Sequence, residues 1–268
     1  MSLILTEVLE NLIKFIKIMI LQNKLEKHGN WLFRYRGVWP SILLIAGTAV
    51  YAYIEFNPEL FFLEETPYEI YYEVGCLIIC LLGFAVRVYT VGYTPAKTSG
   101  RNTKEQVAER VNTVGMYSVV RHPLYLGNFL LGLGIAFFTG SFWFVLVYCL
   151  VYWLTFERIM FAEEQFLRQK FGQTYTDWAN KTPAFIPDFK LFTKPDLPFS
   201  LKKVLKKEKN GLLALFAIFA FFDVLGEFIE GKHEYTYLFL ICCVVSCIAY
   251  GILKIMKKKT TFLNEVGR

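Results

Sequence analysis

Residues 124–161 of the chain read LYLGNFLLGLGIAFFTGSFWFVLVYCLVYWLTFERIMF. This apolar stretch is divided near its middle by Gly140 and Ser141, a pair of residues that favours a tight turn. A transmembrane helix needs about 20 predominantly apolar residues, so the first arm, 124–139, is short and the second arm is long enough. We therefore predict a helical hairpin whose first arm is short and whose second arm continues past the membrane.

The composition of the whole chain agrees with this hairpin. Hydrophobic residues make up 55% of the 268 residues and charged residues only 19%, against about 25% charged residues in soluble domains. Disordered proteins are excluded by this composition, and six cysteines are too few for a disulfide scaffold. The sequence predicts an all-α integral membrane protein, a polytopic bundle of transmembrane helices.

The distribution of charge predicts how the bundle sits in the membrane. Five segments besides 124–139 have the length and composition of spans: 38–54, 71–91, 142–161, 211–229 and 236–256. Of the 29 Lys and Arg residues, 27 lie in the terminal segments and the two long loops on one side of these spans, and the opposite loops are acidic. Basic loops face the cytoplasm, so we expect both termini and the active site there, at the inner membrane if the protein is bacterial.

Three regions are predicted along the chain. Residues 1–30 should form an amphipathic helix in the membrane interface, because its charged residues share one side of a helix: Glu7, Glu10, Lys14 and Lys17. Residues 31–190 form the transmembrane core, and 191–268 add a basic linker and two further helices. We expect the lysine run of that linker to contact anionic lipid and not nucleic acid.

A first polar motif, GMYSVVRHPLYLG, occupies residues 115–127. Proline favours the first turn of a helix, so a helix should begin at Pro123. Arg121 and His122 then lie just before an N-terminus, where unpaired backbone N–H groups favour an anion. Gly127 permits a close approach to the backbone. Taken alone, this motif is better explained by side chains that anchor a span at the interface.

A second polar motif, ERIMFAEE, occupies residues 157–164, and FGQTY follows at 171–175. Glu157 and Glu164 share a helix face, with Glu163 beside them. Acids at the cytoplasmic end of a span suit a cationic or hydroxyl-rich ligand. Taken alone, the same acids are explained by ion pairs with Arg168 or Lys170 on a solvated helix.

Together the two motifs resemble those of the isoprenylcysteine carboxyl methyltransferase family and the related phospholipid N-methyltransferases. The shared order is Tyr-Ser-x-x-Arg-His-Pro-x-Tyr-x-Gly, a hydrophobic hairpin, and Glu-Glu-x-x-Leu-x-x-x-Phe-Gly-x-x-Tyr. The resemblance covers about residues 75–190. It implies a membrane enzyme that takes a methyl group from S-adenosylmethionine.

The resemblance also implies which residues form the site. Those expected to bind the cofactor are Tyr117, His122, Pro123, Leu124, Tyr125, Gly127, and Glu163 or Glu164. Arg158, upstream of the paired glutamates, is implied to hold the methyl acceptor, and Arg121 and Glu157 join it as candidate catalytic residues. Three histidines far apart in the sequence give no support for a metal site.

The loop before the first motif bears on the acceptor. Lys97, Arg101 and Lys104 stand there among hydroxyl and amide groups, a composition that suits an anionic head group. The loop resembles that of bacterial enzymes that methylate lipid A phosphate, although a cytoplasmic loop obeying the positive-inside rule would look the same. We expect a membrane lipid carrying a phosphate or carboxylate as substrate. The alternatives are a prenylcysteine carboxylate, a phospholipid amine, or a non-enzymatic transporter or scaffold.

Overall fold

The structure, a computed structural model, describes residues 2–61, 63, 66–96, 106, 108–231, 235–265 and 267. For residues 2–11, 13, 15, 16 and 18 it describes the backbone alone. Within the described residues the secondary structure is helical, with one isolated antiparallel bridge between Gly115 and Thr193. The predicted all-α class is confirmed.

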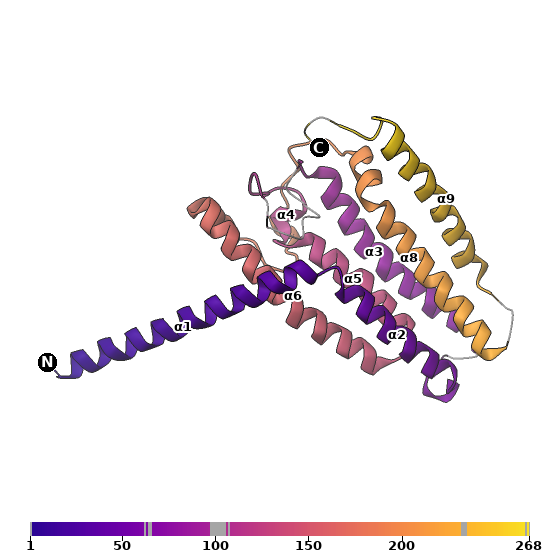
Figure 1. The fold of residues 1–268 in the computed structure, drawn as a ribbon, viewed down its shortest axis with the longest axis horizontal. Coiled ribbons are helices and arrows are strands. Elements are labelled where there is room, and N and C mark those ends of the chain that lie inside the picture. Colours follow the sequence, from indigo (N-terminus) through magenta and orange to yellow (C-terminus); the bar gives the residue numbers. More distant parts are fainter. Residues whose placement is uncertain are drawn as a thin grey trace.

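The described helices follow the predicted segments closely (Figure 1). They are α1 (Ser2–Tyr35), α2 (Trp39–Glu55), α3 (Glu69–Tyr93), α4 (Met116–Val119), α5 (Pro123–Phe138), α6 (Phe142–Phe171), α7 (Gln173–Ala179), α8 (Leu201–Glu230) and α9 (Tyr237–Lys259), with short 3-10 turns at Pro58–Leu60 and Phe189–Leu191. The hairpin forms between α5 and α6. Gly140 takes a positive φ of 69° in its turn, and the Ser141 side chain accepts a hydrogen bond from the Phe144 amide at 3.4 Å, which caps α6.

Four helices are long and apolar enough to cross a membrane, namely α3, α6, α8 and α9. A fifth candidate is a bent pair, formed by residues 19–35 of α1 and by α2, with an angle of 71° between the two parts. The helix α5 has 16 residues and is shorter than a full span. The protein is therefore an integral membrane protein with several spans, and the sixth crossing stays a prediction.

The N-terminal helix extends further than predicted, to Tyr35 instead of residue 30. Its last turns pack on α6, where Leu32 and Phe33 share a core with Tyr152. Of the four charges predicted to share one face, Lys14 and Lys17 are exposed, and the side chains of Glu7 and Glu10 lie outside the description. The interfacial role of this helix stays a prediction.

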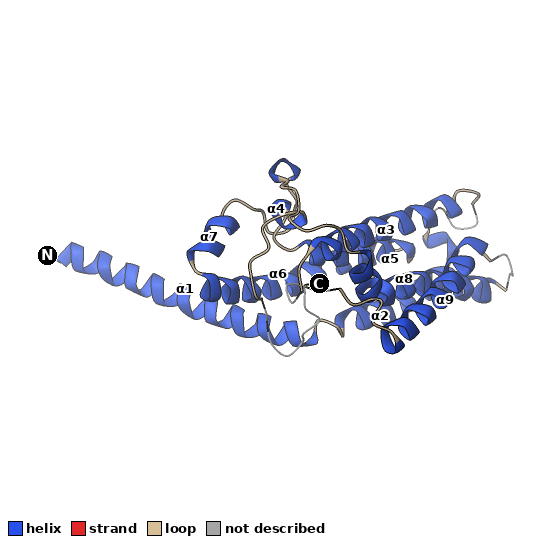
Figure 2. Ribbon diagram, turned by 90° about the horizontal axis from the view of Figure 1, so that it is seen from above, coloured by secondary structure: helices blue, strands red, loops and turns tan. Residues whose placement is uncertain are grey.

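The helix α5 lies at the centre of the bundle. One core cluster joins it to α1 and α6, and a second joins it to α2, α3, α8 and α9. Figures 1 and 2 show α3 and α5 side by side, with α8 next to α3 and α9 outermost. The N-terminus of α5 therefore emerges in the middle of one end of the bundle, which is where the first polar motif lies.

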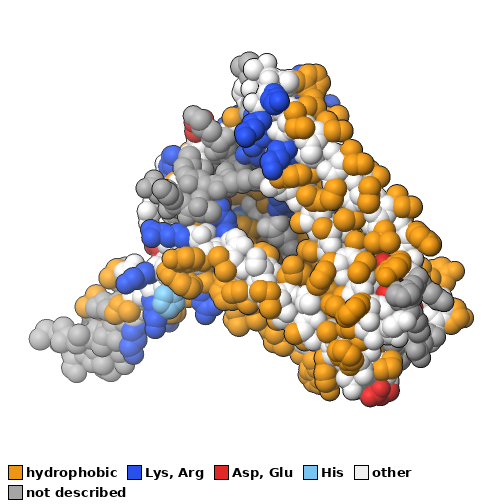
Figure 3. All heavy atoms as spheres, turned by 45° about the vertical axis from the view of Figure 1, so that its right-hand side comes forward, with side chains coloured by type: hydrophobic (Ala, Val, Ile, Leu, Met, Phe, Trp, Pro, Cys, Tyr) orange, Lys and Arg blue, Asp and Glu red, His pale blue; other side chains and the backbone are white. Residues whose placement is uncertain are grey.

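Charge divides the surface of the molecule. Hydrophobic side chains cover the flank of the bundle in Figure 3, and Lys and Arg gather around a hollow near one end of it. Acidic side chains appear at the opposite end in the same view, and a few also lie near the Lys and Arg side chains. This pattern agrees with the charge asymmetry of the sequence.

Close contact between α3 and α5 depends on glycine. A Cβ at Gly83 would lie 2.6 Å from the carbonyl oxygen of Gly127, whereas a Cβ at Gly75 on the same helix would meet nothing within 4 Å. We predict that Gly83→Ala forces the helices apart and lowers the melting temperature in detergent by roughly 5 °C or more. Gly75→Ala should leave it unchanged or raise it, since alanine favours helix. Equal melting temperatures for the two variants would refute this packing.

Candidate active site

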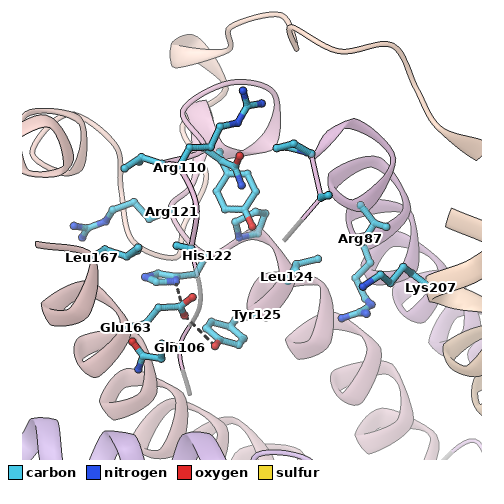
Figure 4. Close-up of a pocket in the computed structure, with 18 of the residues that line it drawn as sticks. Arg87, Gln106, Arg110, Arg121, His122, Leu124, Tyr125, Glu163, Leu167 and Lys207 are labelled. Atoms are coloured by element: carbon cyan, nitrogen blue, oxygen red, sulfur yellow. Dashed lines mark hydrogen bonds and ion pairs between the residues drawn. The ribbon is translucent and has the colours of Figure 1, made fainter. Parts of the chain in front are cut away.

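A cavity of about 860 Å³ opens at the polar end of the bundle (Figures 3 and 4). Its lining comes from the end of α1, from α3 to α8, and from the C-terminal tail. The volume lies in the range of about 300–1,000 Å³ that is typical of ligand sites. Both motifs from the sequence contribute side chains to it.

The first motif meets the second through Glu164. His122, whose side chain is 5% exposed, places its Nε2 atom 3.1 Å from Oε1 of Glu164. Arg121 donates from Nη1 to Oε2 of the same carboxylate, also at 3.1 Å. Because His122 immediately precedes Pro123, these contacts tie the N-terminus of α5 to α6.

The neighbouring carboxylate, Glu163, is held from the side and faces the cavity. Tyr125 donates a hydrogen bond to its Oε2 at 3.0 Å, and His122 Nδ1 lies 3.8 Å from the same atom (Figure 4). Tyr152 fixes the backbone there by donating to the Tyr125 carbonyl at 2.6 Å. Glu163 lines the cavity with a side chain 33% exposed, and Glu164 is 14% exposed. The two glutamates therefore have different surroundings: Glu164 is engaged by protein and Glu163 is open to a ligand.

The surroundings set the protonation of several site groups. Glu164 stands on the last turns of α6, beyond its apolar stretch. Burial would raise its pKa, but the hydrogen bond with His122 and the charges of Arg121 and Arg168 outweigh burial and hold the pKa below its ordinary value. Burial raises the pKa of Tyr117 and of Tyr175. At neutral pH the carboxylate is ionised and both phenols keep their protons as donors.

Polar atoms without a partner are concentrated around the cavity. Among the described residues, five buried side-chain nitrogen or oxygen atoms have no hydrogen-bond partner, and four of these belong to residues that line it: Gln106 Oε1, Arg121 Nε, Tyr175 Oη and Trp178 Nε1. Buried polar atoms are normally hydrogen-bonded. A bound ligand or ordered water is expected to complete this set.

Most of the residues predicted to bind a cofactor do line the cavity: Tyr117, His122, Pro123, Leu124, Tyr125 and Glu163. Arg121, predicted as a catalytic residue, lines it as well. Gly127 does not. A Cβ there would lie 2.6 Å from the Arg87 side chain and 2.8 Å from the Gly83 carbonyl, so this glycine allows α5 to pack against α3.

Two predicted catalytic residues lie away from the cavity. Glu157 is exposed, and Arg158 donates to the Leu154 carbonyl within its own helix. Neither is among the described residues that line the cavity, so their predicted roles at the reacting atoms have no support in this geometry. The three loop residues predicted to hold the acceptor, Lys97, Arg101 and Lys104, lie outside the described residues.

Sequence reasoning missed one wall of the cavity. Arg87 on α3 donates to both carboxylate oxygens of Glu208 on α8, each at 2.9 Å, and to Asn128 on α5. An arginine within an apolar span was the available signal, because such a charge requires a partner. The lysine run expected to contact lipid also contributes: Lys203 is buried and donates to the Thr94 carbonyl.

We predict that Glu164→Gln lowers thermal stability at pH 7, because a buried hydrogen bond to a charged group contributes about 1.5–3 kcal/mol. The pKa of Glu164 in the folded protein lies below its ordinary value of 4.5. Its contribution is therefore present above that pH and lost as pH falls further. Melting curves of the wild type and the variant should converge below about pH 4.5.

The control for this measurement is Glu157→Gln, on the same helix but exposed. It should melt like the wild type at both pH values. A Glu164→Gln protein as stable as the wild type at pH 7 would show that the carboxylate does not hold the two motifs together.

Comparison with known proteins is consistent with this site. Residues 71–174 match the phospholipid methyltransferase family. The chain is 39% identical over 75 residues to a protein-S-isoprenylcysteine O-methyltransferase of Schizosaccharomyces pombe. The aligned region covers 28% of this chain and 32% of that protein. It is 34% identical over 118 residues to the nickel-cobalt-cadmium resistance protein NccN of Alcaligenes xylosoxydans xylosoxydans, with 43% of this chain and 52% of that protein covered.

A third relative is a probable protein-S-isoprenylcysteine O-methyltransferase of Oryza sativa subsp. indica, 29% identical over 160 residues, with 57% of this chain and 82% of that protein covered. No solved structure matches the chain. The matches to the first curated relatives span about a third to about half of their length. Residues 71–174 of this chain are therefore similar in sequence to phospholipid methyltransferases, and the chain resembles several isoprenylcysteine O-methyltransferases over part of its length.

Proposed function

We propose that the protein is a membrane methyltransferase that uses S-adenosylmethionine and acts on a lipid-borne anionic acceptor at the cytoplasmic interface. The observation that carries this proposal is the joining of the two motifs around one cavity, where His122, Tyr125 and Glu163 contact one another. The methyltransferase class follows from the family that residues 71–174 match. The cytoplasmic side follows from the positive-inside rule.

The residues around the cavity fit S-adenosylmethionine. That cofactor carries two cationic centres, a ribose and an adenine. The Glu163 carboxylate, oriented by Tyr125, can accept from a cationic or hydroxyl group of such a ligand. Trp178 and Tyr175 each bring a polar atom that lacks a partner among the described residues, beside an aromatic ring. These four side chains therefore match a ligand that combines positive charge with an aromatic base.

When bound, S-adenosylmethionine supplies an electrophilic methyl group on a cationic sulfur, and its transfer to an anionic oxygen forms a C–O bond as the C–S bond breaks. A phosphate or carboxylate oxygen is already nucleophilic, so the protein needs no strong base for it. The contribution of this chain is to align the reactants and to exclude water. Phe33 and Phe166 line the cavity and suit the second task.

The charges on opposite sides of the cavity favour an anionic acceptor. Glu163 lies on one side, and Arg87 and Lys207 lie across from it (Figure 4). A cationic donor and an anionic acceptor would be drawn to different sides and so face one another. A phospholipid amine is less suited, since it would meet these cations and must lose a proton before it reacts. A prenylcysteine carboxylate, suggested by the names of several relatives, satisfies the same charges.

We predict that Glu163→Gln and His122→Ala each abolish measurable binding of S-adenosylmethionine, because Glu163 is the carboxylate that faces the cavity and His122 lies against it. Calorimetry on protein purified in detergent measures this directly, with melting temperature as the check on folding. Glu157→Gln, exposed on the same helix as Glu163, is the matched control. Undiminished binding in both site variants would contradict the cofactor assignment.

The acceptor can be identified in an experiment that does not assume its chemical class in advance. We predict that incubating the purified protein with labelled S-adenosylmethionine and a total lipid extract labels a lipid bearing a phosphate or a carboxylate. Mass spectrometry should find this lipid heavier by one CH₂ unit. Label appearing only on amine head groups would reject the anionic acceptor and favour the phospholipid amine alternative.

A further inference from the structure

We propose that Arg87 and Lys207 form the binding site for the anionic head group of the acceptor, on a wall formed by α3 and α8. This inference rests on the proposed function and adds the residues that select the acceptor. The wall lies partly outside the region that matches the family, because residues 71–174 end before α8 begins at Leu201. The part of the chain after residue 174 would thus contribute Lys207 to the choice of acceptor.

The start of α8 is fixed in place from two directions. The Ser200 side chain accepts from the Lys203 amide at 3.1 Å and donates to Glu265 of the C-terminal tail. Lys206 donates to Asn264 of the same tail at 2.7 Å. Lys203 is buried, and its Nζ donates to the Thr94 and Pro95 carbonyls at the end of α3. This wall is therefore ordered before any ligand binds.

The guanidinium of Arg87 is oriented by its neighbours and retains capacity for a ligand. It donates from Nε and Nη2 to Glu208, and from Nη1 to Asn128 at 2.5 Å. A guanidinium has five N–H donors, so three are engaged and two remain. Asn128 lies three residues after Tyr125 on α5, on the same helix face. Arg87 is thus coupled to the helix that orients Glu163.

The balance of charge at this wall favours an anion. The described residues that line this wall bring four positive charges, from Arg87, Lys203, Lys206 and Lys207, and two negative charges, from Glu208 and Glu265. The Glu208 side chain is only 5% exposed. Figure 4 shows the ends of Arg87 and Lys207 directed toward the same part of the cavity. Two cations that converge in a partly buried site are stabilised by an anion between them. The two donors of Arg87 that remain, one on Nη1 and one on Nη2, lie in the guanidinium plane and suit a phosphate or carboxylate oxygen.

The test measures lipid binding by the full chain in detergent, using a fluorescent phosphatidic acid displaced by unlabelled ligands. The unlabelled ligands are phosphatidic acid, oleate, phosphatidylcholine and inorganic phosphate. We expect displacement by phosphatidic acid or oleate. Lys207→Gln should weaken the binding of the displacing lipid about tenfold or more, since one charge-assisted contact is lost. Lys202→Gln, exposed on the same helix and outside the cavity lining, should change it less than about twofold.

Three results would overturn the inference: equal lipid affinity in Lys207→Gln and wild type, displacement by phosphatidylcholine as strong as by phosphatidic acid, or displacement by inorganic phosphate alone. The last result would assign the site to a free anion instead of a lipid head group. S-adenosylmethionine binding is measured on the same samples. If the wild type does not bind S-adenosylmethionine, the result counts against the proposed function. If it binds S-adenosylmethionine but its lipid binding does not depend on Lys207, the result counts against this inference only.

A second variant tests Arg87 without leaving a buried charge unpaired. Because removing one member of a buried ion pair destabilises the fold strongly, Arg87→Gln is combined with Glu208→Gln. The double variant should retain S-adenosylmethionine binding and bind phosphatidic acid or oleate more weakly than the wild type. When Lys207→Gln is added, the triple variant should bind these lipids more weakly than Lys207→Gln alone. Unchanged lipid affinity in a folded double variant would remove Arg87 from the site.

Discussion

The carboxylate of Glu164 joins the two parts of the candidate site. It receives His122 and Arg121 from a segment more than forty residues earlier in the chain, across a hairpin that only a turn at Gly140 makes possible. Three cationic or hydrogen-bonding neighbours satisfy it, so Glu164 has little capacity left for a ligand. That arrangement leaves Glu163, one position earlier, directed at the cavity, where the hydrogen bond from Tyr125 orients its carboxylate. The polar end of α5 is positioned by the same contacts.

The cavity that results has two chemically different sides. One is built by the two motifs and presents the Glu163 carboxylate, aromatic side chains and the Arg121 guanidinium, which Glu164 pairs. The other is built by α3 and α8 and presents an excess of positive charge. Opposite charges on the two sides of this cavity of about 860 Å³ would bring a cationic donor and an anionic acceptor together, so that the protein would need to supply little beyond their alignment. The glycine-mediated contact between α3 and α5 sets how far apart these two sides lie.

Sequence reasoning reached the features that local physics determines. The hairpin and most spans follow from apolar length, and the start of α5 follows from Pro123. It could not decide between Glu163 and Glu164, because adjacent helical residues point about 100° apart and only the rotation of α6 against α5 selects one. It assigned Gly127 to ligand approach, whereas the neighbouring helix uses that space.

Two charged residues have surroundings that their positions in the sequence did not indicate, and the physical cause is the same for both. Arg158 follows Glu157 in the motif but turns back to a carbonyl of its own helix, and Lys203 belongs to a basic run yet is buried against the end of α3. Tertiary packing decides such outcomes, and composition carries no information about it. Arg87 carried a signal that was not used, since a charge within an apolar span implies a partner, although the sequence alone does not identify Glu208 as that partner.

The central claim is that the two motifs hold one cofactor between them. Hydrogen–deuterium exchange of the protein in nanodiscs, with and without S-adenosylhomocysteine, tests it most directly because it needs neither an acceptor nor a variant. The account predicts added protection in two separate groups of peptides, one covering 115–128 and one covering 160–178, with α9 unchanged. Protection absent from both groups, or confined to a region distant from the cavity, would contradict it.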